Sequence, residues 1–231
     1  MRIAILSDIH ANAVALKAVL EEARTLKVEC LFILGDLVGY YYQPKQVLLM
    51  LENWMKKVIQ GNHERMLVEA ENDQKRAEHI RECYGSGLDV AMTQLSQEDK
   101  SWLALLPRSE IVKMDLINCL LCHGSSYDPD AYLYPNTKSY LLERTIQQGV
   151  DFVFIGHTHH PFIFQHQGIM LVNVGSVGQS RVRGGIAQWA VLDTSNRSIV
   201  PRQTPFATET IIKEARDRDP KLPYLWQVLQ R

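Results

Sequence analysis

The N-terminal part of the chain alternates short apolar segments with longer amphipathic ones. Residues 2–6 are largely apolar, bounded by polar positions and too short for a helix, which predicts a buried strand. The next segment has apolar residues at the i, i+3, i+4, i+7 spacing of one helical face: Leu16, Val19, Leu20 and Ala23. Asn12 precedes this face as a candidate N-cap, so the pattern predicts a helix that follows the strand.

The same order of strand and helix then repeats. Residues 30–34 predict a second buried strand. Pro44 suits the first turn of another helix, whose predicted apolar face consists of Val47, Leu48, Leu51 and Met55. Residues 57–59 predict a third short strand. Strands that alternate with helices are typical of parallel β-α-β units.

The rest of the chain continues as a mixture of helices and strands. Residues 62–106 have a polar, helical pattern with a break at 85–87, which predicts several short helices. A helix is expected near 138–148, with Gly149 at its C-terminal cap. Strands are expected at 110–114, 117–122, 151–155, 162–164, 169–172, 187–192 and 199–200.

The tail after Thr204 is expected to pack one more helix on the body through Ile211, Ile212, Leu222 and Trp226. No internal repeat, low-complexity segment or linker divides the pattern. The sequence therefore predicts one α/β domain over residues 1–231.

Composition and charge narrow the classes of function. The 231 residues are 46% hydrophobic and 22% charged, as in globular proteins. Lys plus Arg number 25 against 26 Asp plus Glu, so there is no global basic field for generic nucleic-acid binding. Asp8 and His10 interrupt any signal-peptide core, and no apolar run approaches the roughly 20 residues of a membrane span. With four cysteines, the expected compartment is the reducing cytoplasm.

Residue types that bind metal ions stand at the ends of five predicted strands. They are Asp8 and His10, then Asp36, then Asn62 and His63, then His123, and finally His157 and His159. Ligands of open α/β sheets bind beyond the carboxyl ends of the strands, so these loops are expected to meet at one site. Asp-x-His and His-x-His place alternate side chains on one side of an extended segment.

Each residue type suits a site for two metal ions. A carboxylate can bridge two cations and offset their repulsion, and Asp36 is the best-placed candidate. Imidazole suits manganese, iron, nickel or zinc, whereas carboxylate and amide oxygens favour the harder ions of that range. Two such ions can clamp a phosphoryl group and generate a bridging hydroxide near neutral pH.

Taken in order, these motifs resemble the calcineurin-like metallophosphoesterase superfamily. The series is Asp8-x-His10, Gly35-Asp36-x-x-Gly39, Gly61-Asn62-His63, His123-Gly124 and Gly156-His157-x-His159. Residues 8–12, 35–40 and 173–179 are most similar to its small bacterial and archaeal phosphodiesterase-like branch. The resemblance implies a four-layer α-β-β-α sandwich with two mixed sheets.

The resemblance also implies roles for individual residues. One divalent ion would be held by Asp8, His10, Asp36 and His159, and the other by Asp36, Asn62, His123 and His157. Asn62 and His63 would contact the substrate phosphate, and His63 would assist the leaving group without binding metal. Asp36, Asn62 and His63 are thus the expected catalytic residues. Two transition metal ions are implied, with manganese favoured over iron, nickel, zinc or cobalt.

The implied function is hydrolysis of a small phosphorylated substrate by a metal-bridging hydroxide. The substrate would be a phosphodiester, a phosphomonoester or a dinucleoside polyphosphate. A serine/threonine phosphoprotein phosphatase is an alternative within the same superfamily. A second alternative is a non-catalytic scaffold, because the same fold serves in a membrane-trafficking coat. The presence of His63 and of every ligand position speaks against a pure scaffold.

Three segments depart from the family pattern. Glu64 stands where Asp is usual, with little expected effect on the metals. Residues 181–185 are atypical, and residues 41–43 replace a segment that often has Gly and Asp, so no substrate preference is carried over. Two interpretations of Tyr40, Tyr41 and Tyr42 stay open: stacking on a substrate base or sugar, or partial burial under the helix that starts at Pro44.

Other reactive residue types are interpreted structurally. Cys119, Cys122 and His123 match the pattern of c-type haem attachment and of a thiol pair, but packing in a buried strand is the preferred interpretation. Structural or exposed positions are expected for His79, His160 and His166. We expect ordinary surface charges, and not anion-binding groups, at Arg181, Arg183 and Arg202.

Overall fold

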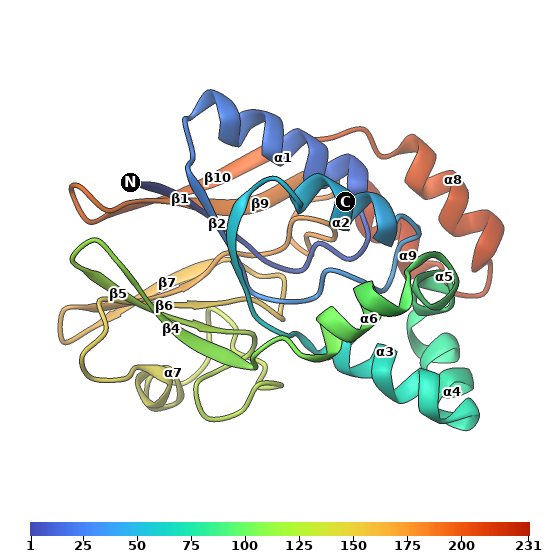
Figure 1. Cartoon of the computed structure of the whole chain (residues 1–231), viewed down its shortest axis with the longest axis horizontal. Helices are drawn as coiled ribbons and strands as arrows, with labels where there is room; N and C mark the ends of the chain where they lie inside the picture. Colours follow the sequence, from blue (N-terminus) through green and yellow to red (C-terminus); the bar gives the residue numbers. More distant parts are fainter.

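Two five-stranded mixed sheets lie face to face in the computed structural model, which describes residues 1–231 (Figure 1). The first sheet has the order β10-β9-β1-β2-β3, and β1, β2 and β3 run parallel. Its strands are β1 (Arg2–Leu6), β2 (Cys30–Ile33), β3 (Met55–Val58), β9 (Ile186–Asp193) and β10 (Ser198–Pro205). In this sheet β9 pairs antiparallel with both β1 and β10.

The second sheet has the order β4-β5-β6-β8-β7, with a parallel centre and antiparallel edges. Its strands are β4 (Ser109–Met114), β5 (Ile117–Cys122), β6 (Phe152–Ile155), β7 (Phe162–His166) and β8 (Ile169–Asn173). The central strands are buried on both faces, which explains why they are continuous apolar runs in the sequence.

Alternating side chains of each strand divide the interior into three apolar layers. Between the sheets, Ile5 and Phe32 pack with Leu121 and other residues of the second sheet. The opposite face of the first sheet packs against the helices α1 (Ala13–Thr25) and α2 (Pro44–Leu51). The outer face of the second sheet packs against α7 (Ser139–Thr145). The expected four-layer α-β-β-α sandwich is therefore confirmed.

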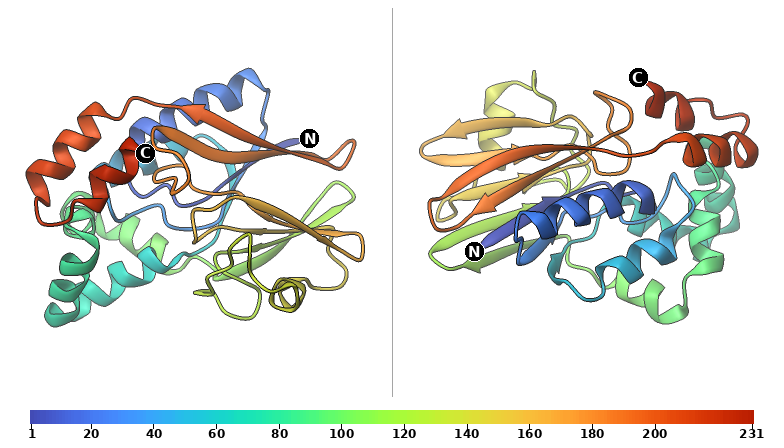
Figure 2. Two further views of the ribbon diagram at one scale, coloured as in Figure 1. Left: turned by 180° about the vertical axis from the view of Figure 1, so that it is seen from behind. Right: turned by 90° about the horizontal axis from the view of Figure 1, so that it is seen from above.

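Two groups of helices cover the end of the sandwich at which the parallel strands terminate. The first group consists of α3 (Asn62–Asn72), α4 (Gln74–Tyr84), α5 (Gly87–Gln94) and α6 (Gln97–Ala104). The tail forms α8 (Glu209–Arg218), α9 (Tyr224–Gln227) and a 3-10 turn at Val228–Gln230. Figure 2 shows α8 and α9 beside α4 and α5, where Asp219 accepts the backbone N–H of Ser86 at 2.9 Å. No helix of the protein combines the length and the apolar character that a membrane crossing requires.

Two sequence-based boundaries were wrong. Met55 continues the apolar spacing of α2, but α2 ends at Leu51 and Met55 opens β3, where it is 58% exposed. The chain turns at residues 52–54 because β3 has to reach its partner β2. The helix expected near 138–148 ends at Thr145, and extended backbone at Ile146 terminates it. Gly149 therefore lies in a turn and caps no helix.

Candidate metal centre

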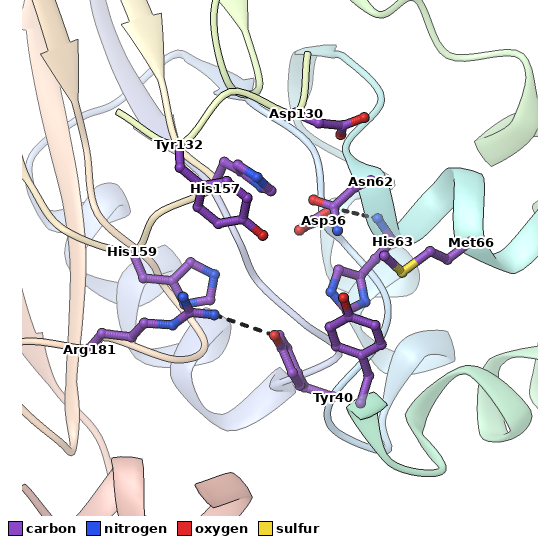
Figure 3. A pocket seen from close by; sticks show the side chains of 11 residues that line it. Asp36, Tyr40, Asn62, His63, Met66, Asp130, Tyr132, His157, His159 and Arg181 are labelled. Atoms are coloured by element: carbon purple, nitrogen blue, oxygen red, sulfur yellow. Dashed lines mark hydrogen bonds between the residues drawn. The ribbon is translucent and has the colours of Figure 1, made fainter. Parts of the chain in front are cut away.

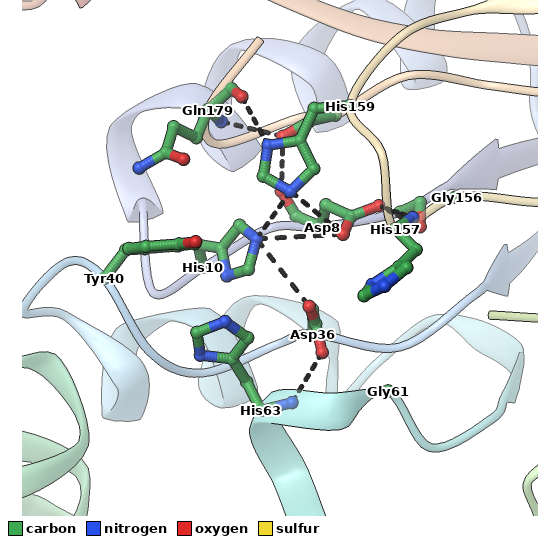
Figure 4. A network of polar contacts seen from close by, with 12 residues as sticks. Asp8, His10, Asp36, Tyr40, Gly61, His63, Gly156, His157, His159 and Gln179 are labelled. Carbon is green, nitrogen blue, oxygen red and sulfur yellow. Dashed lines mark hydrogen bonds and ion pairs between the residues drawn. The ribbon is translucent and has the colours of Figure 1, made fainter. Parts of the chain in front are cut away.

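The loops after β1, β2, β5 and β6, together with the start of α3, bring all seven expected ligands to one end of the sheets. Figure 4 shows Asp8, His10, Asp36, His157 and His159 at this end. Metal-binding atoms lie within 4.8 Å of one another in two groups: Asp8, His10 and His159, and then Asp36, His123 and His157. The Asn62 side-chain oxygen lies 2.9 Å from His123 Nε2, which joins it to the second group.

In the first group, two imidazole nitrogens face each other. His10 Nε2 and His159 Nε2 are 3.0 Å apart. Their Nδ1 atoms lie beside backbone carbonyl oxygens, at 3.3 Å for His10 and 2.7 Å for His159, so each Nδ1 is the atom placed to donate a proton. The two Nε2 lone pairs then point at each other. Asp8 Oδ1, which is buried and has no hydrogen-bond donor, lies 3.2 Å from His159 Nε2. A bound cation would satisfy all three acceptors together.

The second group gathers around His123. His123 Nδ1 lies 2.7 Å from the carbonyl oxygen of Leu34, to which it donates, so Nε2 is the atom that faces the other members of the group. Around that Nε2 are the oxygen of Asn62 at 2.9 Å and a carboxylate oxygen of Asp36 at 3.4 Å. The same Asp36 oxygen is 3.8 Å from His10 Nε2 in the first group. Asp36 is thus the one carboxylate placed between the two groups.

The pKa values of these residues report a strong preference for positive charge at the centre. Burial disfavours the charged form of His123, but the Asp36 and Asp8 carboxylates outweigh burial and raise its pKa to about 10. Burial and the charge of His123 lower the pKa of His157 to about 4. Burial alone would raise the pKa of Asp36, yet the surrounding histidines hold it well below the usual range. The carboxylates are therefore ionised and ready to bind cations.

The ligand loops have an unusual backbone. Five ligands have left-handed φ angles between 51° and 66°: Asp8, His10, Asp36, His157 and His159. Residues other than glycine adopt this region at an energetic cost, and Asp and His are among the types found there most often. This conformation turns the chain sharply after each strand and directs consecutive ligands into the centre.

Glu64 has a role that the sequence analysis underestimated. It is fully buried, and its carboxylate accepts the backbone N–H groups of Asp36 at 2.9 Å and Leu37 at 2.7 Å. It also accepts the N–H of Gly61 at 2.8 Å as the third residue of α3, which closes a capping box. Glu64 thereby fixes the loop that carries Asp36, a role that the sequence analysis did not assign to it, and its effect on metal binding stays a prediction.

His63 lies against the same centre. Its backbone N–H donates to Asp36 at 2.8 Å, and its ring nitrogens lie close enough to His10 and Asp36 to form a third potential metal-binding group. The ring is 2% exposed, and its centroid is 4.8 Å from that of Tyr40. A Cβ on Gly39 would lie 2.0 Å from His63 Nδ1, so the absence of a side chain at Gly39 makes room for the ring.

A cleft of about 160 Å³ opens beside the metal centre (Figure 3). Besides ligands and His63, it is lined by Tyr40, Met66, Tyr84, Asp130, Tyr132 and Arg181. Arg181 was expected to be an ordinary surface charge, but it lines this cleft and its guanidinium lies 3.4 Å from the Tyr40 hydroxyl. Arg183 is exposed, and Arg202 pairs with Glu22 on the far side of the first sheet.

The three consecutive tyrosines divide between the cleft and the core. Tyr40 lines the cleft, but Tyr41 and Tyr42 are 1% and 2% exposed and pack against the tail. The Tyr41 hydroxyl donates to the carbonyl oxygen of Leu225 at 3.0 Å, and that of Tyr42 donates to Asp219 at 2.7 Å. Tyr41 and Tyr42 therefore have no access to a substrate, and the stacking interpretation is wrong for both.

The structural interpretation of Cys119 and Cys122 agrees with the fold. Cys119 lies between the sheets and Cys122 lies on the outer face of the second sheet, and both are buried. Burial raises the pKa of each thiol to about 12, which leaves it unreactive. Outside the metal centre, His79 is exposed and His160 and His166 are half-buried.

Comparisons with known proteins agree with this geometry. The family model of the calcineurin-like phosphoesterase superfamily domain matches residues 1–197. The Methanocaldococcus jannaschii protein MJ0912 is 26% identical over 214 residues, which cover 85% of this chain and 84% of that protein. The match to the family ends before α8 and α9, so the tail that buries Tyr41 and Tyr42 lies outside it.

Two crystal structures share the fold over nearly the whole chain. Pyrococcus horikoshii PH1004 superposes with a TM-score of 0.87 at 21% identity, covering 99% of this chain and 97% of that one. A metallophosphoesterase from Sphaerobacter thermophilus superposes with a TM-score of 0.78 at 24% identity, covering 100% and 99%.

Proposed function

Because the chain belongs to the calcineurin-like phosphoesterase superfamily, we propose that it hydrolyses small phosphoesters with the help of two divalent metal ions. The observation that carries this proposal is the clustering of potential metal-binding atoms in both ligand groups. His10 Nε2 and His159 Nε2 are 3.0 Å apart, and His123 Nε2 is 2.9 Å from the Asn62 oxygen. Each group of acceptors fits a cation, and Asp36 lies between the groups.

The donor set favours transition metals. One ion would be held by Asp8, His10, Asp36 and His159, and the other by Asp36, Asn62, His123 and His157. Imidazole combined with carboxylate and amide oxygen suits manganese, which we propose as the ion used. Bound ions of this kind supply Lewis acidity and a nucleophile that is available near neutral pH.

Residues that line the cleft would bind the phosphate and assist the leaving group. Asn62 and His63 stand at the start of α3, where they would contact the phosphate oxygens. Burial lowers the pKa of His63, so at neutral pH it offers a neutral imidazole N–H. That N–H would donate a hydrogen bond to the departing oxygen while water adds to phosphorus and the ester P–O bond breaks. The attacking water gives up one proton and the leaving oxygen takes one up, so His63 ends as it began, a neutral imidazole.

The size of the cleft favours a small phosphorylated substrate over a phosphoprotein, because about 160 Å³ leaves little room for a folded partner's side chains. The full ligand set with His63 favours an enzyme over a scaffold. We also propose that the protein works in the cytoplasm, in keeping with its four free cysteines.

The test compares His63→Gln and Asp36→Asn in protein stripped of metal and reloaded with Mn²⁺. His63→Gln is expected to keep both ions and to lose about 10²–10⁴-fold in kcat, with a larger loss on alkyl than on aryl esters. Asp36→Asn is expected to lose metal and to fail on both substrates. Elemental analysis that finds active protein with one ion or none would refute the two-metal proposal. Loss of metal from His63→Gln would make His63 a ligand.

A further inference from the structure

Arg181 is a cation without a carboxylate partner in the cleft. It forms no salt bridge, and its guanidinium makes one hydrogen bond, to the Tyr40 hydroxyl at 3.4 Å. Asp130 is the one acid in the cleft outside the metal ligands, and it pairs with Arg65. The guanidinium of Arg181 therefore has hydrogen-bond donors free to bind an anion.

The position of Arg181 is fixed relative to the metal centre. The carbonyl oxygen of Gln179, two residues earlier, accepts a hydrogen bond from the ligand His159 at 2.7 Å. Tyr40, the hydrogen-bond partner of Arg181, has its ring centroid 4.5 Å from that of His10. The backbone oxygen of Arg181 is held by the Arg231 side chain at 3.3 Å. The loop thus presents the guanidinium beside the ligands in a defined place.

Phenol groups complete this part of the cleft. Tyr40 and Tyr84 both line the cleft, with ring centroids 6.0 Å apart. Tyr132 lies across the cleft from Tyr40, with its hydroxyl directed into the cleft (Figure 3). The Tyr132 ring centroid is 4.3 Å from that of the ligand His157. A phenol carries its proton at neutral pH, so both hydroxyls can donate hydrogen bonds. A guanidinium among phenol donors matches the oxygen atoms of an anionic group.

We infer that Arg181 and Tyr40 bind a second phosphoryl group of the substrate while the metal centre holds the scissile one. The substrate class is then a compact phosphoester or phosphoanhydride with two neighbouring phosphoryl groups. This inference rests on the proposed function. The cleft holds Arg181 and the metal centre side by side, which suits two adjacent phosphoryl groups.

The test measures selectivity in the Mn²⁺-loaded protein. The probes are AMP and α,β-methylene-ADP, used with excess metal as competitive inhibitors of aryl phosphodiester hydrolysis. The wild type is expected to bind α,β-methylene-ADP at least about 10-fold more tightly than AMP. Arg181→Gln should reduce this ratio by about 10-fold, to near 1, because the charge-assisted hydrogen bonds to the second phosphoryl group are lost, and Arg181→Lys should restore part of it. Arg183→Gln is the matched control, because Arg183 is exposed in the same loop.

The outcomes separate this inference from the proposed function. Equal inhibition by the two nucleotides in the wild type, or an equal loss of both in Arg181→Gln, would overturn the second-phosphoryl site while hydrolysis stands. A wild type that hydrolyses no ester would overturn the proposed function. Binding of the same two nucleotides would then be measured by calorimetry, and the inference would hold only if Arg181→Gln removes the preference.

Discussion

Gly39→Ala is expected to displace His63 and to impair hydrolysis without removing metal. Gly39 has a φ of +85°, and a Cβ there would lie 2.0 Å from His63 Nδ1. Ordinary van der Waals contact begins near 3.4 Å, so the difference from 2.0 Å requires a movement of about 1.4 Å. The ring is 2% exposed and packed against Tyr40, so it can move only by displacing its neighbours or by entering the cleft that it lines.

The magnitude follows from two contributions. An alanine in the left-handed region costs about 1 kcal/mol, and forcing a packed ring aside costs about 1–3 kcal/mol. For a chain of 231 residues, the resulting loss of about 2–4 kcal/mol lowers Tm by about 5–15 °C. Gly149→Ala is the matched control, because Gly149 has a φ of +86° and no atom within 4 Å of the added Cβ. The control carries the backbone strain alone, about 1 kcal/mol.

The assay combines thermal unfolding of the wild type and both variants with metal content and kcat. Gly39→Ala should keep its metals, unfold at a lower temperature than Gly149→Ala, and show the reduced kcat expected of His63→Gln. If Gly39→Ala and Gly149→Ala unfold together and Gly39→Ala retains the wild-type kcat, then His63 does not occupy the position beside Gly39.

Three further predictions concern the ligand loops and the tail. Glu64→Ala should weaken Mn²⁺ binding in a metal titration, because three backbone N–H groups around the Asp36 loop lose their acceptor. Tyr42→Phe should destabilise the protein by about 1–2 kcal/mol in urea unfolding, through loss of the hydrogen bond to Asp219, and leave KM unchanged. Mn²⁺ affinity should rise about tenfold per pH unit between pH 6.5 and 8.5, because His123, with its pKa raised to about 10, must release a proton to bind metal. Calorimetry in buffers of different ionisation enthalpy should detect that proton. A Mn²⁺ affinity that does not change with pH would contradict this assignment.

The strands and the ligands could be predicted because their signals are local. Residues 30–34 form a short apolar run, which a central strand buried on both faces requires. Asp36 follows that strand directly, and ligand positions at the ends of parallel strands share one edge by topology alone. Asp36 could be identified as a candidate ligand from its place after the strand, without a prediction of its left-handed backbone.

The cleft could not be predicted, because it depends on segments that are distant in the sequence. Tyr132 and Arg181 lie in irregular loops that have no periodicity, and only the packing of the two sheets brings them together. Tyr41 and Tyr42 are aromatic, as residues that stack on a substrate would be. They are buried by residues of the tail, which lie more than 170 positions later in the sequence.

Glu64 is an intermediate case. Its position as the third residue of a helix is a local capping signal, which the sequence contains. That it also holds the loop of Asp36 is visible only in the fold.

The left-handed backbone at the ligand positions makes the metal centre easy to lose over evolutionary time. Replacing Asp8, His10 or His157 by glycine removes a ligand and also relieves strain of about 1 kcal/mol at that position. The strain gives selection for stability no reason to keep these ligands, so their maintenance depends on selection for the function of the site. A lineage released from that second selection could keep all four layers, gain stability, and become a binding scaffold within a few substitutions.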